Sequence, residues 1–510
     1  MPRPAFAAAA FLGLALALSP TTTRSAELAP APRGSSAALD ALLLAEVKER
    51  SELMKNLQYM SDVIGPRLTG SKNLERANTW TAEKMKAYGL ENVRLEPWEI
   101  PVGWVRGKAT MRLVEPDNGR ELAIASYGWT PGTGGKKTGK VVVLTARTKA
   151  DLDAHRGKLK NATVLLSAPK EVKPITDLNY PAPAGPSAGQ PKKDEPKLPD
   201  PKSGAEPKAT DLRQSGLDAV TEFLKAEGAA CVCTDAGKPH GLLVTTGGWP
   251  ADRAAAEARL PRVFMAHEHY ALLHRLATRP DATTKVEVEI ENTFVPGPVT
   301  VYNTVGEVTG GEKPDEFVVV GAHLDSWELA SGTTDNATGS CVVLEIARTV
   351  AALAKAGERP RRTIRFVLFT GEEQGLHGSK KYCERHKDEL PRHSAALVHD
   401  TGTGKVHGLG LHGRTAVREV LEPQLGALAK VDGWKGLDMR GMGGTDHLSF
   451  HAAGVPGFAC LQDIDEYRLT HHTQSDTFDK AKEPNLVQGA QVLGVAVVRI
   501  ANLPELLPRK

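Results

Sequence analysis

Residues 317–327 read FVVVGAHLDSW, and residues 362–373 read RTIRFVLFTGEE. Both stretches are apolar enough to form central strands of a sheet, and both end in polar, titratable side chains. The chain around them alternates between strand and helix patterns, with helices expected at 335–354 and 377–386. Such alternation predicts an α/β fold with a mixed central sheet and helices on both faces.

The end of the first strand carries His323 and, two residues later, Asp325. In sheets of this kind, ligands collect at the carboxyl ends of the strands. An imidazole there can bind a metal, and a carboxylate two residues away can hold the ring in one tautomer. A hydrogen-bonded structural histidine is the alternative, and it is the more common role for a single strand-end histidine.

Asp335 stands where a turn leads into the next helix. An aspartate at this place caps a helix well, and it can equally bridge metal ions. The helix has an apolar face that includes Val343, Ala347 and Val350. Burial of that face would hold Asp335 firmly. The sequence leaves both roles open.

Glu372 and Glu373 end the second strand as adjacent carboxylates. Where a buried strand ends, two such groups repel each other unless a cation or a proton offsets their charge. One can bind metal while its neighbour takes a proton from activated water and passes it to a leaving amine. A solvated pair in a loop is the alternative.

Asp400 ends a further apolar strand at 395–400, and His472 lies in the polar stretch HHTQSDT at 471–477. The candidate ligands are two histidines and three carboxylates: His323, Asp335, Glu373, Asp400 and His472. This set suits two zinc ions that share one carboxylate, each with an open position for water.

The rest of the chain predicts a second, smaller domain. From about 126 to 285 the sequence changes to short β-type runs with glycine-rich connections. Within this region, residues 173–211 are rich in Pro, Lys, Asp and Gly, which predicts a flexible stretch. Residues 38–125 and 286–506 would then form the first and main parts of the larger domain.

The first residues resemble an export signal. Arg3 precedes an apolar run at 5–18, which predicts a signal peptide over residues 1–26 and a secreted or periplasmic protein. The run is too short to span a bilayer comfortably, although a membrane-anchoring helix is the alternative. No later segment has a long uninterrupted apolar run, so we expect no stable membrane insertion after signal removal.

Composition narrows the function further. The formal net charge of +3 is weak for 510 residues and gives no sign of nucleic-acid binding. Five cysteines are an odd number without zinc-ribbon spacing, so buried free thiols are expected.

The site motifs, together with DVIGPRLTGS at 62–71, resemble zinc peptidase family twenty-eight, the aminopeptidase and carboxypeptidase Q-like enzymes. The resemblance implies that Asp335 bridges two zinc ions and that Glu372 is the catalytic base. We count Asp325 with Glu372 among the catalytic residues, because it would hold the His323 ring. The resemblance favours His472 over His471 as the metal ligand, because TQSDT follows His472 at the spacing of the family. The region 126–285 resembles an inserted protease-associated domain.

The stretch GGTDH at 443–447 resembles a loop of the family that lies near the substrate. His447 or Tyr467 could therefore steady an oxyanion, although ordinary loop hydrogen bonding explains both residues equally simply.

The resemblance thus implies a secreted di-zinc exopeptidase that hydrolyses free-amine peptides or dipeptides. A homodimer is compatible with it. Three rivals stay open: a non-catalytic receptor-like scaffold, a single-zinc glutaminyl cyclase, and an interaction module built around the inserted domain. The complete ligand set argues against the scaffold, and the presence of His323 argues against the cyclase.

Overall fold

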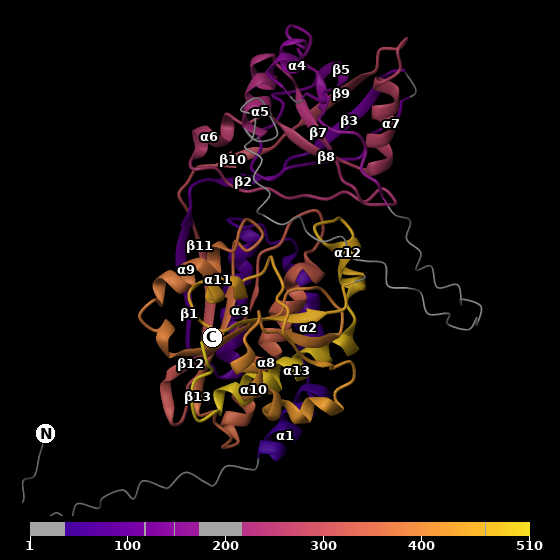
Figure 1. Ribbon diagram of the computed structural model, residues 1–510. Helices are drawn as coiled ribbons and strands as arrows, with labels where there is room; N and C mark the ends of the chain where they lie inside the picture. Colours follow the sequence, from indigo (N-terminus) through magenta and orange to yellow (C-terminus); the bar gives the residue numbers. More distant parts are fainter. Residues whose placement is uncertain (1–35, 117–118, 147, 173–216, 465, 510) are drawn as a thin grey trace, which may run out of the picture.

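The computed structural model describes residues 36–509 apart from 117–118, 147, 173–216 and 465. The expected signal peptide and the expected flexible stretch at 173–211 lie outside the described residues. Figure 1 shows two lobes, which we call the larger and the smaller domain. The chain enters the smaller domain after β2 (Gly103–Val105) and leaves it before β10 (Thr293–Val295), and these two short strands pair with each other.

The larger domain is built on an eight-stranded mixed sheet. Its order is β1 (Glu91–Ile100), β11 (Val299–Val308), β13 (Arg362–Phe369), β12 (Lys313–His323), β14 (His393–Val398), β17 (Gly457–Gln462), β15 (Val406–Gly410) and β16 (Gly436–Asp438). The central strands β13, β12, β14 and β17 are parallel, whereas β1 and β11 are antiparallel to their neighbours. The α/β fold with a mixed sheet is therefore confirmed.

Helices cover both faces of this sheet because its central strands are apolar on both sides. Val318 and Val320 of β12 pack with one set of helices, and Val319 between them packs with the other. The first set is α1 (Ser36–Glu49), α2 (Leu53–Gln58), α3 (Lys72–Tyr88), α8 (Thr338–Lys355) and α13 (Glu483–Ala501). The second set is α9 (His377–Arg385) and α11 (His447–Ala452).

Shorter helical elements complete the larger domain. They are η1 (Tyr59–Ile64), η2 (Thr333–Ala337), η3 (Leu390–Arg392), α10 (Thr415–Leu421), η4 (Glu422–Lys430), α12 (Tyr467–Thr470) and η5 (Phe478–Lys480). One described helical segment, Thr333–Lys355, is long and apolar enough to span a membrane. It is largely buried inside the larger domain, so we interpret it as a core helix. All five cysteines are buried and free, as expected.

The smaller domain has its own seven-stranded sheet. The strand order is β3 (Ala109–Glu115), β9 (Lys285–Ile290), β5 (Lys137–Val143), β6 (Thr163–Leu165), β7 (Cys231–Asp235), β8 (Arg262–Met265) and β4 (Ile124–Ser126). Its helices are α4 (Lys149–Asp153), α5 (Leu217–Ala226), α6 (Arg253–Glu257) and α7 (His267–Ala277). Because Ala109 pairs with Ile290, this sheet extends beyond the expected limits of 126 and 285.

Candidate metal centre

Three adjacent strands bring the predicted site residues to one edge of the large sheet. His323 is the last residue of β12, opposite Phe369 of β13, and Asp400 follows β14 on the other side of β12. Glu372 and Glu373 follow β13. The parallel register of these strands explains why residues 77 positions apart, such as His323 and Asp400, come into contact.

The first group of side chains surrounds the His323 ring, which is 1% exposed. Its Nε2 lies 2.9 Å from Oδ1 of Asp400, 3.4 Å from Oδ1 of Asp335 and 4.0 Å from Oε2 of Glu372. The opposite nitrogen, Nδ1, donates to the main-chain carbonyl of Asp325 at 2.9 Å. This bond leaves Nε2 free to act as a metal ligand.

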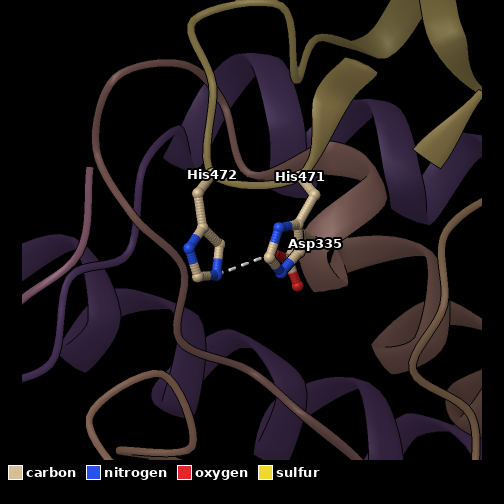
Figure 2. A group of neighbouring side chains, drawn as sticks. All are labelled: Asp335, His471 and His472. Carbon is tan, nitrogen blue, oxygen red and sulfur yellow. Dashed lines mark ion pairs between the residues drawn. The ribbon is translucent and has the colours of Figure 1, made fainter. Parts of the chain in front are cut away.

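The second group is formed by His472, Glu373 and the other carboxylate oxygen of Asp335. Nε2 of His472 lies 2.8 Å from Oε2 of Glu373 and 3.5 Å from Oδ2 of Asp335. Figure 2 marks the ion pair between His472 and Asp335 with a dashed line, and the ring of His471 overlaps Asp335 in this view. Asp335 therefore lies between the two groups, with one oxygen toward each histidine.

The neighbouring His471 also lies at this site. Its ring stacks on that of His472 with centroids 3.8 Å apart, and its ligand atoms lie within 4.8 Å of those of Asp335 and His472. Burial lowers the pKa of His471 to about 4. His472, however, has the ion pair with Glu373, which favours His472 as the ligand.

Buried charge at this site calls for cations. Oδ2 of Asp335 and Oε1 of Glu373 are buried without a hydrogen-bond partner among the described residues. Burial raises the pKa of the Glu372 and Glu373 carboxyls well above their usual range, and nearby carboxylates add to this. Groups of this kind are stable when a metal ion compensates them, so the residues fit two divalent cations on either side of Asp335.

The carboxylate of Asp325 has a different task from the one expected. It lies 3.7 Å from Nδ1 of His323, too far for a hydrogen bond, and the main-chain carbonyl of Asp325 orients the ring instead. The carboxylate accepts the backbone N–H groups of Glu372 and Glu373, both at 3.3 Å, and the hydroxyl of Thr69 at 3.0 Å. It therefore positions the glutamate pair.

Asp476 positions Asp335 in a similar way. Its two carboxylate oxygens accept the backbone N–H groups of Thr334, at 2.5 Å, and Asp335, at 3.1 Å. In the sequence, Asp476 stands out only through its spacing after His472, which gives no sign of this positioning role.

Arg67 is a further positioning residue that the sequence did not reveal. It is fully buried, and its guanidinium donates to the carbonyls of Leu324, at 2.8 Å, and Ser331, at 2.9 Å, as well as to those of Gly65 and Gly332. These contacts fix the loop between His323 and Asp335. The only sequence signal was the motif at 62–71, because the contacts join residues more than 250 positions apart.

An open cavity of about 430 Å³ lies over the site. Among the described residues, its lining is acidic and imidazole-rich and includes no lysine or arginine: Asp335, Glu372, Glu373, Gly375, Leu376, Asp400, Thr401, Met442, Gly443, Gly444, Tyr467, His471 and His472.

The two residues expected near a substrate differ in their position relative to the cavity. Tyr467 lines the cavity, and burial raises the pKa of its hydroxyl well above the usual range. His447 does not line it. Its Nε2 lies 2.7 Å from Nε2 of His412 instead.

This fold and this set of residues define a metallopeptidase. Residues 303–497, which lie in the larger domain, match the profile of Peptidase family M28.

Its relatives extend the likeness over nearly the whole chain. Carboxypeptidase Q of Bos taurus is 29% identical over 470 residues, which cover 91% of this chain and 88% of the relative. Two solved structures share the fold. The Peptidase M28 precursor from Shewanella amazonensis has a TM-score of 0.73 at 24% identity and covers 93% of this chain and 98% of its own. A zinc aminopeptidase from Bacillus subtilis has a TM-score of 0.58 at 19% identity, with coverages of 88% and 93%.

Proposed function

We propose that the protein is an exopeptidase that uses two zinc ions to hydrolyse free-amine peptides or dipeptides. The observation that carries the proposal is the position of Asp335, whose two oxygens face two separate histidine and carboxylate groups beneath an open cavity. One ion would be held by His323, Asp335 and Asp400, and the other by Asp335, Glu373 and His472. Oxygen and imidazole ligands of this kind suit zinc.

Glu372 is the catalytic base in this proposal. Its carboxylate lines the cavity 4.0 Å from Nε2 of His323, whereas the other three acids that line the cavity are assigned as ligands. Zinc, when bound, lowers the pKa of water and polarises a carbonyl. Glu372 takes the proton of the attacking water and delivers it to the leaving amine. Asp325 holds the backbone of Glu372 in place for both transfers.

The cavity favours a substrate with a free amine. Its lining holds several carboxylates and, among the described residues, no cationic side chain to pair with a substrate carboxylate. A dipeptide offers a free amine and a free carboxylate at once. It therefore fits the names of both kinds of relative, a carboxypeptidase and an aminopeptidase.

We also propose export of the protein, through the signal peptide expected at residues 1–26. The smaller domain stands where a protease-associated domain would be inserted, and we propose that relationship for it. A homodimer stays a prediction.

A hydrolysis assay tests the function. We expect the protein to cleave unblocked dipeptides, to lose activity with a chelator and to regain it with added zinc. N-acetylated peptides should be cleaved far more slowly, whereas carboxyl-terminal amides should be affected less. Absent or metal-independent cleavage would contradict the proposal and favour a receptor-like scaffold or an interaction module. Release of pyroglutamate would favour a glutaminyl cyclase.

A further inference from the structure

The smaller domain touches the loop that carries His472. The backbone N–H of Thr245 donates to the carbonyl of His472 at 3.0 Å, and Val244 forms a β-bridge with Thr473. The N–H of Leu243 donates to Oε1 of Gln474 at 2.7 Å. A segment of the smaller domain thus pairs with the loop as a short strand would.

Arg106 ties this segment to a second loop of the site. Its Nε donates to Oε1 of Glu328 at 2.8 Å, and another guanidinium nitrogen donates to the hydroxyl of Thr245 at 2.8 Å. A third contact reaches the carbonyl of Ser126. The side chains of Arg106 and Glu328 are each 14% exposed, so solvent weakens this ion pair little.

Glu328 lies in the loop between His323 and Asp335, the same loop that Arg67 holds from the other side. One guanidinium therefore bonds both to the smaller domain and to the loop between two proposed ligands. Through its hydrogen bond to Thr245, the guanidinium of Arg106 is also linked to the backbone of His472, a third proposed ligand.

The contact between the domains is apolar as well as polar. Trp129 and Trp249 of the smaller domain lie with ring centroids 5.4 Å apart, and Trp327 of the larger domain lies 6.4 Å from Trp129. Trp327 in turn lies 6.1 Å from the ring of His472. Buried aromatic contacts of this kind join two domains more firmly than a flexible tether would.

His472 needs such support from outside its own loop. Its backbone has a φ of +60°, a sparsely populated conformation for a residue other than glycine. Its side chain is 20% exposed, whereas that of His323 is 1% exposed. Neither a strand nor a long helix fixes it.

We propose that Arg106 is a positioning residue through which the smaller domain holds His472 in its metal-binding geometry. This inference rests on the proposed function. It assigns the smaller domain a part in assembling the site, since the domain supplies the backbone donor that holds the ligand loop. Outer contacts of a metal ligand commonly change affinity by about 10- to 100-fold.

The test compares Arg106→Ala with Arg112→Ala in the full-length, zinc-loaded protein. Arg112 lies on β3 and pairs only loosely with Glu287 of the same sheet, at 3.6 Å, so it is a matched control. Zinc retention is measured by dialysis against increasing concentrations of a chelator. The kinetic constants kcat and KM are measured with an unblocked dipeptide, and folding is measured by thermal melting. Arg106→Ala should lose one of its two ions about 10- to 100-fold more readily, with a matching fall in kcat that excess zinc restores.

Two further variants keep the inference testable if Arg106→Ala does not fold. Arg106→Lys keeps a charge for Glu328 but lacks the fork that also reaches Thr245 and Ser126, so it should give an intermediate result. Glu328→Gln keeps the shape and should weaken zinc retention in the same direction.

Unchanged zinc retention in folded Arg106→Ala, or in Glu328→Gln if Arg106→Ala does not fold, would overturn the inference. Wild-type protein without bound zinc or dipeptidase activity would instead overturn the proposed function.

Discussion

The two halves of the proposed metal centre are built in different ways. His323 and Asp400 stand at the ends of adjacent strands in the most buried part of the sheet, and we call them the strand half. Glu373 and His472 form the loop half, in which His472 lies on an irregular segment supported by the smaller domain. Asp335 belongs to both halves.

The difference shows that one half is set by sheet register and the other by contacts between distant segments. In the strand half, moving a ligand would require moving a packed strand. In the loop half, a hydrogen bond from the Thr245 N–H holds the backbone carbonyl of His472. We therefore expect the ion of the loop half to be the more readily lost.

The shared residue gives the largest expected effect. Asp335→Ala removes a ligand from both halves, so both ions should be lost and activity should fall below detection. Metal content per chain and dipeptide hydrolysis measure this directly. Retention of a full complement of metal would show that the two halves do not share Asp335.

Glu372→Gln should affect the rate without affecting either half as a binding site. Loss of a general base lowers kcat by about 10²- to 10⁴-fold. Metal content should equal that of the wild type, because the proposal assigns no ligand role to Glu372. If the variant also loses metal, Glu372 is a ligand and the base must be another group.

Removing one histidine from each half compares them directly. His472→Ala should retain about one ion per chain, and its metal-free form should melt close to the temperature of the wild-type apoprotein. His323→Ala should melt at a lower temperature, because it leaves a cavity and unpaired carboxylates in the buried edge of the sheet. Equal melting temperatures for the two variants would argue against the distinction.

Acid should weaken the sheet that supports the strand half. His393 begins β14, and burial lowers its pKa to about 4 from an ordinary value near 6.5. Its neutral form therefore stabilises the fold above pH 6.5, and this contribution, at most roughly 3 kcal/mol, is lost as the pH falls through 4. Chemical denaturation of the apoprotein between pH 7 and 4 should show a shallower loss in His393→Gln.

The smallest expected effect is at Thr69, which donates to Asp325. Thr69→Val removes the hydroxyl at constant shape, and kcat should fall about fivefold, equivalent to about 1 kcal/mol. Thr79→Val on α3 is the matched control, because its hydroxyl bonds only to Glu75 of the same helix. A rise in KM with an unchanged kcat would place Thr69 in substrate binding instead.

The strand half could be predicted from residues alone. Apolar runs that end in His323 and Asp400 mark strand ends, and parallel strands bring their ends together. In the loop half, His471 and His472 are adjacent and chemically identical, so only the resemblance to a family separated them.

The positioning residues were not predictable because they act over long separations. Thr69 and Asp325 are 256 positions apart, and no local pattern distinguishes such a threonine. The limits of the smaller domain were also misplaced by the change in sequence texture, since its first and last strands, β3 and β9, pair across the whole insertion.

Anomalous diffraction at the zinc edge from crystals of the zinc-loaded protein tests the central claim most directly. We predict two peaks on either side of Asp335, one bonded to His323 and Asp400 and the other to Glu373 and His472. A single peak, or peaks bonded to other residues, would contradict this account of the site.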